Sequence, residues 1–254
     1  MRLKWMRPVA CAALLCCLIP AAGQAAGAKP KSREYYETRG DIVWEVPMEE
    51  KWIALTFDDG PDPVYTPQIA DLLKQYEAKA TFFVTGERTA RFPDTARKLV
   101  ADGHELGNHT MKHSYFRRGT SEKTIDTEIR KAKEAIRAAG LTDAPWFRPP
   151  GGHYSESIVA AAKQHGYTVV LWSWHQDTED WRAPGVAKIT NKVLNNARNG
   201  DIVLFHDHGE GASQTVQALT KILPELKNRG FRFVTVTELL GERKRQGHPV
   251  DDAG

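Results

Sequence analysis

One short apolar run ends directly in two acidic residues and a turn, in the stretch Trp52-Ile-Ala-Leu-Thr-Phe-Asp-Asp-Gly-Pro61. An apolar run of this length, bounded by a turn signal, predicts a buried strand. Further strands are predicted at 80–84, 104–107, 146–148, 168–172, 201–205 and 231–234. Helical spacing of apolar residues separates them at 67–76, 92–101, 121–139, 155–165, 186–197 and 215–227, and a last helix begins near residue 236. This alternation predicts an α/β fold with a parallel sheet, in a single domain that forms a distorted or incomplete (β/α) barrel; a doubly wound open sheet is the alternative.

The composition is that of an ordinary globular protein. Of the 254 residues, 41% are hydrophobic and 26% are charged, which excludes a disordered chain, a collagen-like repeat and a helical membrane bundle. We expect four regions: a signal peptide over 1–28, a polar linker over 29–50, the folded domain over 51–241 and a charged tail over 242–254.

The first 28 residues have the pattern of an export signal. Arg2, Lys4 and Arg7 precede an apolar run over 9–19 and small residues over 25–28. The run is too short to span a bilayer, and its ending is typical of a cleavage site. The pattern predicts a secreted, cell-wall or periplasmic protein with no stable membrane span after cleavage; a retained N-terminal anchor is the alternative.

Cysteine use and charge limit the chemistry of the remaining chain. All three cysteines lie at positions 11–17, so any metal outside this region must be held by His, Asp or Glu. Without the three basic residues of the leader, 32 basic residues face 32 acidic ones. This balance does not indicate a nucleic-acid partner.

Ionisable side chains follow several of the predicted strands. Asp58-Asp59 follows the first strand, His109-Thr-Met-Lys-His113 follows the third, Arg148 and Asp180 come at or after the ends of the fourth and fifth, and His206 follows the sixth. In either fold, side chains at the carboxyl ends of parallel strands meet at one edge. Each signal alone has an ordinary reading, namely a solvated turn for the acids and a core histidine for His206.

Together these residues suit a catalytic metal site. Two histidines four apart can face one cation if the segment coils as one helical turn, and a carboxylate would complete a three-ligand site with open positions. One of Asp58 and Asp59 would bind the metal, and the other would accept a proton from water. A His₂Asp site favours Zn²⁺, with Co²⁺ or Ni²⁺ as substitutes. Arg148 could hold a carboxylate by a bidentate pair.

At these residues the chain resembles the polysaccharide deacetylases of carbohydrate esterase family 4, which act on chitin, peptidoglycan and nodulation factors. Five motifs appear in the family's order: Thr56-Phe-Asp-Asp-Gly-Pro61, His109-Thr-Met-Lys-His113, Arg148-Pro-Pro-Gly151, Asp177-Thr-Glu-Asp-Trp181 and Leu204-Phe-His206. The resemblance implies a distorted (β/α) barrel and metal-dependent removal of N-acetyl groups from a peptidoglycan or chitin-like glycan.

The resemblance also implies a role for each motif residue. It makes Asp58 the base, His206 the general acid, Asp180 the residue that tunes His206, and Arg148 the residue that positions Asp58. It implies three metal ligands (Asp59, His109 and His113) and four substrate-binding residues (Pro149, Gly151, Trp181 and Leu204). Many members carry a tyrosine where this chain has Gly151. The backbone N–H that stabilises the oxyanion is still present, but the aromatic ring that would line the site is absent.

Two other functions remain open at this point. A glycoside hydrolase would use two carboxylates, such as Asp58 and Asp180, and no metal. A glycan-binding protein would keep the fold without turnover. The sequence is compatible with either GlcNAc or MurNAc as the sugar, and it does not indicate an oligomeric state.

Overall fold

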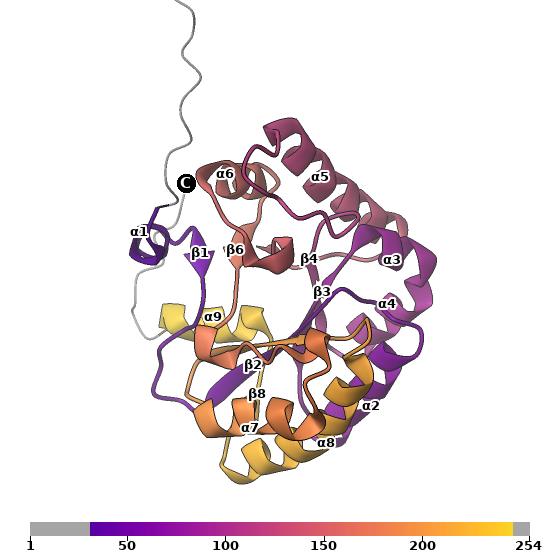
Figure 1. Cartoon of the computed structure of the whole chain (residues 1–254), viewed down its shortest axis with the longest axis vertical. Helices are drawn as coiled ribbons and strands as arrows, with labels where there is room; N and C mark the ends of the chain where they lie inside the picture. Colours follow the sequence, from indigo (N-terminus) through magenta and orange to yellow (C-terminus); the bar gives the residue numbers. More distant parts are fainter. Residues whose placement is uncertain (1–30, 246–254) are drawn as a thin grey trace, which may run out of the picture.

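The structure is a computed structural model that describes residues 31–245, in which short parallel strands alternate with helices (Figure 1). The strands are β1 (Ile42–Val43), β2 (Trp52–Asp58), β3 (Ala80–Val84), β4 (Glu105–Asn108), β5 (Trp146–Phe147), β6 (Thr168–Val170), β7 (Asp201–His206) and β8 (Arg232–Phe233). The α-helices are α1 (Arg33–Thr38), α2 (Tyr65–Gln75), α3 (Gly86–Arg91), α4 (Pro93–Ala101), α5 (Glu122–Ala138), α6 (Glu156–Gln164), α7 (Val186–Asn196), α8 (Ala212–Asn228) and α9 (Val236–Arg245). Three 3₁₀ turns, η1 (Pro150–Gly152), η2 (Trp174–Gln176) and η3 (Asp180–Arg182), lie in the loops.

The sheet confirms the incomplete barrel. Its strand order is β1-β6-β5-β4-β3-β2-β7, all pairs are parallel, and β8 pairs with β2. From β2 to β6 the order follows the chain without a reversal, whereas a doubly wound sheet reverses its order at a switch point. Among the residues described, β1 and β7 do not pair, so the ring of strands stays open.

The core forms because the central strands are apolar and the helices carry one apolar face. The ring of Phe57 on β2 stacks between Phe82 and Phe205, with centroids 4.9 and 5.5 Å away. Capping sets the start of α5, where the Ser121 hydroxyl accepts a hydrogen bond from the backbone N–H of Thr124. These contacts hold the central strands in place under the carboxyl edge of the sheet.

The prediction of a polar linker over 29–50 is wrong for its described part. Helix α1 and strand β1 belong to the domain, and β1 pairs with β6. Tyr36 and Trp44 are fully buried, and both rings pack edge-on against Tyr154 at 5.4 and 5.5 Å. A six-residue helix and a two-residue strand are too short to leave a readable period, so the two aromatic residues were the usable signal. The domain also extends beyond residue 241, because α9 continues to Arg245.

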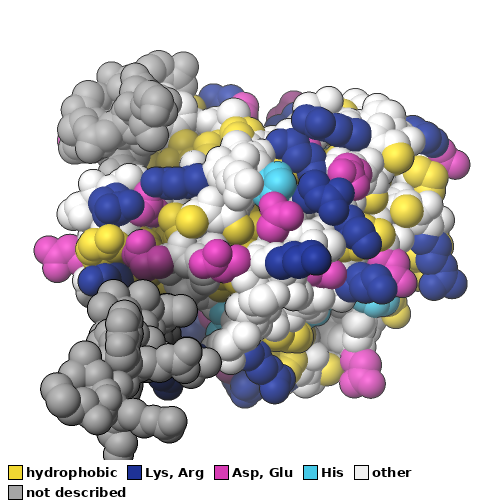
Figure 2. All heavy atoms as spheres, turned by 90° about the horizontal axis from the view of Figure 1, so that it is seen from above, with side chains coloured by type: hydrophobic (Ala, Val, Ile, Leu, Met, Phe, Trp, Pro, Cys, Tyr) yellow, Lys and Arg dark blue, Asp and Glu magenta, His cyan; other side chains and the backbone are white. Residues whose placement is uncertain are grey.

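Other predictions fall partly outside the described residues. The signal peptide over 1–28 and the tail from residue 246 onward lie there. Within residues 31–245, no helix is long and apolar enough to cross a bilayer. Lys, Arg, Asp and Glu side chains are interspersed over the face seen from above (Figure 2), which agrees with the balanced charge of the sequence.

Candidate metal and catalytic site

Four strand ends bring the predicted site residues together. Asp58 and His206 are the last residues of β2 and β7 and stand in register as neighbours. His109 directly follows β4 and Arg148 directly follows β5. Because all these strands are parallel, their carboxyl ends form one edge, as the sequence predicted.

Asp59, His109 and His113 form a cluster of possible metal ligands. One ligand atom from each lies within 4.8 Å of the others. His113 Nε2 is 3.0 Å and His109 Nε2 is 3.3 Å from Asp59 Oδ1. The cluster therefore offers two nitrogens and one oxygen to a single point.

The two histidines do not meet through a helical turn. Thr110 and His113 have φ angles of 69° and 56°, so the backbone of this loop enters the left-handed region twice. Asp59 also has a positive φ, 79°. Both carboxylates nevertheless lie near His109 Nε2, Asp59 Oδ1 at 3.3 Å and Asp58 Oδ2 at 3.8 Å. The expected helical turn is wrong, although the expected convergence of the two rings is present.

The polar atoms of this cluster fit a cation. His109 Nδ1 lies 2.7 Å from the backbone carbonyl of Arg148. A carbonyl can only accept, so this nitrogen carries the proton and Nε2 presents a lone pair. Asp59 Oδ1 is buried without a hydrogen-bond partner among the described residues. Burial alone would raise the pKa of Asp59; when the two imidazoles are protonated, as they can be without a cation, their charges hold it well below its usual range. Two imidazole nitrogens and one carboxylate oxygen this close together can act as ligands of a single cation.

Asp58 is held by a fully buried arginine. Arg148 Nη1 donates to Asp58 Oδ1 and to Thr56 Oγ1, both at 2.8 Å. Its Nε and Nη2 donate to the carbonyls of Val170 and Leu171. The predicted bidentate pair is wrong, because only Nη1 of the guanidinium reaches Asp58, and the other two nitrogens donate to backbone carbonyls at the end of β6. Asp58 Oδ2 remains available, 3.8 Å from His109 Nε2.

His206 is fixed by a buried carboxylate. Asp180 Oδ1 lies 2.7 Å from His206 Nδ1, while Asp180 Oδ2 accepts from the backbone N–H of His206 and from Thr215 Oγ1. Burial would lower the pKa of His206, but the Asp180 carboxylate raises it to about 9. His206 Nε2 is thus the ring nitrogen left for proton exchange.

This arrangement removes the two-carboxylate alternative. A glycoside hydrolase needs two carboxyl groups that can reach a sugar. Asp180 is fully buried, and both of its oxygens are engaged. Asp180 therefore cannot serve, together with Asp58, as the second carboxyl group of a glycoside hydrolase.

The four predicted substrate-binding residues differ in exposure. The Trp181 side chain is 52% exposed, and Gly151 is exposed as well. Pro149 and Leu204 are buried. Of the four, therefore, only Trp181 and Gly151 present substantial surface.

A hydrogen-bonded network beside the metal cluster escaped the sequence analysis. Asp62 Oδ2 accepts from Arg88 Nη2 at 2.9 Å and lies 2.8 Å from His208 Nδ1. His208 and Arg88 line a cavity of about 340 Å³ that Asp59 and His113 also border. Behind it, the buried Asp207 carboxylate accepts from Thr66. The position of His208, two residues after His206, was the signal available in the sequence.

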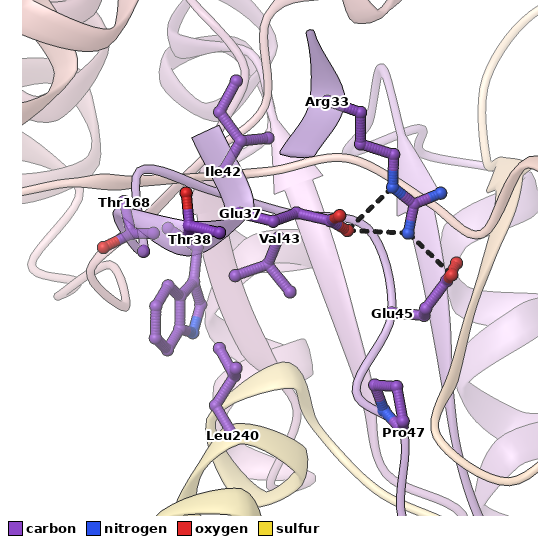
Figure 3. Close-up of a pocket in the computed structure, with 11 residues that line it drawn as sticks. Arg33, Glu37, Thr38, Ile42, Val43, Glu45, Pro47, Thr168 and Leu240 are labelled. Atoms are coloured by element: carbon purple, nitrogen blue, oxygen red, sulfur yellow. Dashed lines mark hydrogen bonds and ion pairs between the residues drawn. The ribbon is translucent and has the colours of Figure 1, made fainter. Parts of the chain in front are cut away.

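Figure 3 shows a second cavity, away from the candidate site residues. It measures about 530 Å³. Ile42, Trp146 and Thr168, the first residues of β1, β5 and β6, line it together with Leu240 of α9. It contains none of the predicted site residues, so the larger of these two cavities is not the candidate site.

The chain is similar to known deacetylases over most of its length. The family model for polysaccharide deacetylase matches residues 45–170. Identity to a peptidoglycan-N-acetylglucosamine deacetylase of Bacillus cereus is 52% over 208 residues, covering 82% of this chain and 97% of that protein. Identity to a chitooligosaccharide deacetylase of a Bradyrhizobium species is 40% over 199 residues, covering 74% and 90%. A crystal structure of a peptidoglycan N-acetylglucosamine deacetylase in complex with 4-naphthalen-1-yl-N-oxidanyl-benzamide superposes with a TM-score of 0.77 and 34% identity, covering 82% and 96%. The chain thus belongs to the polysaccharide deacetylase family.

Proposed function

We propose that this protein is a secreted, metal-dependent hydrolase that removes N-acetyl groups from GlcNAc-type residues of a cell-wall or chitin-like glycan and releases acetate. One observation carries the proposal most directly. The unpartnered Asp59 Oδ1 faces the Nε2 atoms of His109 and His113, and the Asp58–Arg148 and Asp180–His206 pairs belong to the same edge of the sheet.

Asp59, His109 and His113 would hold the metal. The donor set of two imidazoles and one carboxylate favours Zn²⁺, and Co²⁺ or Ni²⁺ could substitute. A divalent cation at this site supplies Lewis acidity to an amide carbonyl and to water. The hydrogen bond from His109 Nδ1 to the Arg148 carbonyl supports the role of His109, because it fixes the ring with Nε2 toward the cluster.

Asp58 would act as the general base. Its Oδ1 is tied to Arg148, whereas Oδ2 is the oxygen nearer His109. An attacking water could give its proton to Oδ2 while its oxygen adds to the acyl carbon. Arg148 would act as a positioning residue, because it holds the carboxylate without reaching the solvent.

His206 would act as the general acid. An amine leaves poorly from the acyl carbon unless it is protonated, so breaking the C–N bond requires a proton donor. The Asp180 carboxylate favours the protonated ring, and the ring offers its proton at Nε2. The products are acetate and a free amine on the sugar. The backbone N–H of Gly151 would stabilise the oxyanion, and Pro149, Trp181 and Leu204 would contact the substrate.

The decisive experiment compares an amide with an activated ester. Wild-type protein loaded with Zn²⁺ should release acetate from at least one member of a panel of N-acetylated peptidoglycan fragments and chitin oligomers. Asp58→Asn should lose activity on both the glycan amide and an aryl acetate, since both need an activated water. His206→Ala should lose far more activity on the amide, because an aryl oxide leaves without a proton. Both variants should keep their metal.

Two results would overturn the proposal. If the wild type binds glycans but releases no acetate with any metal, the protein is a glycan-binding member of the fold. If the amide-to-ester ratio is the same in both variants, the division between base and acid is wrong. The location can be tested separately: protein recovered from outside the cell should begin between Ala25 and Lys29, and an intact Met1 would indicate a retained anchor.

A further inference from the structure

The exposed ring of Tyr115 lies beside the metal cluster in the loop between β4 and α5. The side chain is 50% exposed. Its edge packs against the ring of His113, with centroids 5.0 Å apart and an interplanar angle of 84°. The ring is thus held against a predicted metal ligand, while half of the side chain stays exposed to solvent.

A second neighbour of Tyr115 is the turn that follows β5. A Cβ atom on Gly151 would lie 2.8 Å from Cε1 of Tyr115, closer than real Cβ contacts allow. Gly151 also has a φ of 66°, a conformation that side chains other than glycine's adopt at a cost. The ring therefore bridges the loop after β4 and the turn after β5, and the glycine makes room for it. His153 contacts the same ring, with centroids 6.2 Å apart.

We propose that Tyr115 is a substrate-contacting residue that receives the pyranose ring carrying the acetamido group. This inference rests on the proposed function. A pyranose presents faces of C–H groups together with hydroxyls, and a tyrosine offers an apolar face with a polar tip. Tyr115 contacts both His113, a proposed metal ligand, and the turn of Gly151, whose N–H would stabilise the oxyanion, so its exposed surface borders the position proposed for the reacting acetamido group. The Tyr115 ring thus lies in the space that a side chain at position 151 would occupy, and it supplies an aromatic surface there.

The main competing role is purely structural, since the ring could serve only to orient His113. The two roles predict different kinetics. Loss of a sugar contact weakens binding of the glycan alone. Loss of an orienting contact weakens metal binding and slows every substrate, including one without a sugar.

The test uses the Zn²⁺-loaded full chain with Tyr115→Ala and the matched variant Tyr115→Phe, which keeps the ring. With an N-acetylglucosamine oligomer, Tyr115→Ala should raise KM about tenfold with little change in kcat, the size expected for one aromatic contact and its buried area. Hydrolysis of an aryl acetate and the zinc stoichiometry should stay within twofold of wild type. Tyr115→Phe should resemble the wild type on all substrates. An unchanged KM in Tyr115→Ala, or an equal loss on sugar and ester together with loss of zinc, would overturn the proposal.

A second measurement separates this proposal from the proposed function. Calorimetric binding of the same oligomer to the Asp58→Asn chain, with and without Tyr115→Ala, reports the contact even if the wild type releases no acetate. An equal Kd in the two chains would then refute the contact.

The close approach itself is tested by adding Gly151→Ala to each background. This change should raise KM more in the wild type than in Tyr115→Ala, because only the wild type has a ring to displace. Equal effects in both backgrounds would contradict the inference that Gly151 makes room for Tyr115.

Discussion

Replacing Asp180 by asparagine should move the pH dependence of deacetylation without removing the acid itself. His206 Nδ1 lies 2.7 Å from Asp180 Oδ1, and this carboxylate raises the pKa of His206 to about 9. Asparagine is isosteric with aspartate but uncharged, so the pKa of His206 should fall to its ordinary value of about 6.5 or below. The difference corresponds to about 3 kcal/mol of preference for the protonated ring.

The consequence can be worked out at two pH values. A general acid acts in its protonated form, so activity is lost as the pH rises through its pKa. At pH 8 a group with a pKa of about 9 is about 90% protonated, and one with a pKa of 6.5 is about 3% protonated. Asp180→Asn should therefore lose about thirtyfold in kcat/KM at pH 8 and less than twofold from this cause at pH 6. These two figures apply to the chain without a bound cation; a cation beside His206 would lower both pKa values, so the loss in both proteins would begin at a lower pH, and Asp180→Asn would still lose activity first.

The assay is acetate release from an N-acetylated oligomer between pH 6 and 9.5, together with aryl acetate hydrolysis as an internal control. The ester profile should not shift, because its leaving group needs no proton. Thr215→Val is the matched control, since it removes a hydrogen bond to Asp180 Oδ2 but keeps the charge. Parallel amide profiles for the wild type and Asp180→Asn over the whole pH range would refute the assignment of His206 as the acid.

Three further outcomes follow from the site. His109→Ala should lose most of its bound metal by elemental analysis while keeping its circular dichroism spectrum, and His165→Ala should keep its metal; equal contents would contradict the ligand assignment. Arg148→Met should lower the free energy of unfolding by about 3–5 kcal/mol in urea titrations, because Asp58 stays buried without its partner; a loss below about 1 kcal/mol would show that Asp58 finds another. Burial raises the pKa of Asp207 to about 7, so the folded metal-free chain holds this proton after the unfolded chain has lost it, and stability falls as the pH rises from about 4 to 7. Asp207→Asn should reduce the decrease in the free energy of unfolding between pH 4 and pH 7 by up to about 4 kcal/mol. An unchanged pH dependence of stability would show that Asp207 does not cause this decrease.

Much of the fold was readable along the chain because its signals are local. The strand predicted at 80–84 is strand β3 itself, and the helix predicted at 121–139 differs from α5 by one residue at each end. Apolar runs and helical periods extend over enough residues to be recognised. Helix α3, over Gly86–Arg91, was missed because six residues give too short a period.

The location of the site was also readable, because parallel strands end at a common edge. Asp58, Asp59, His109, Arg148 and His206 all follow or end a strand that the sequence marks. Their order along the chain therefore predicted their meeting without any distance being known.

Tertiary structure alone decided how these groups are held. The Thr215 hydroxyl reaches Asp180 from 35 positions away, and Arg148 spends two of its three donor nitrogens on backbone carbonyls. The approach of Tyr115 to Gly151 likewise joins two loops. Such contacts depend on where separate elements come to lie after folding, whereas sequence patterns report only the period and termini of each element. For this reason the chain itself indicates which chemistry is present, and the packing between elements determines which atom of each residue can perform it.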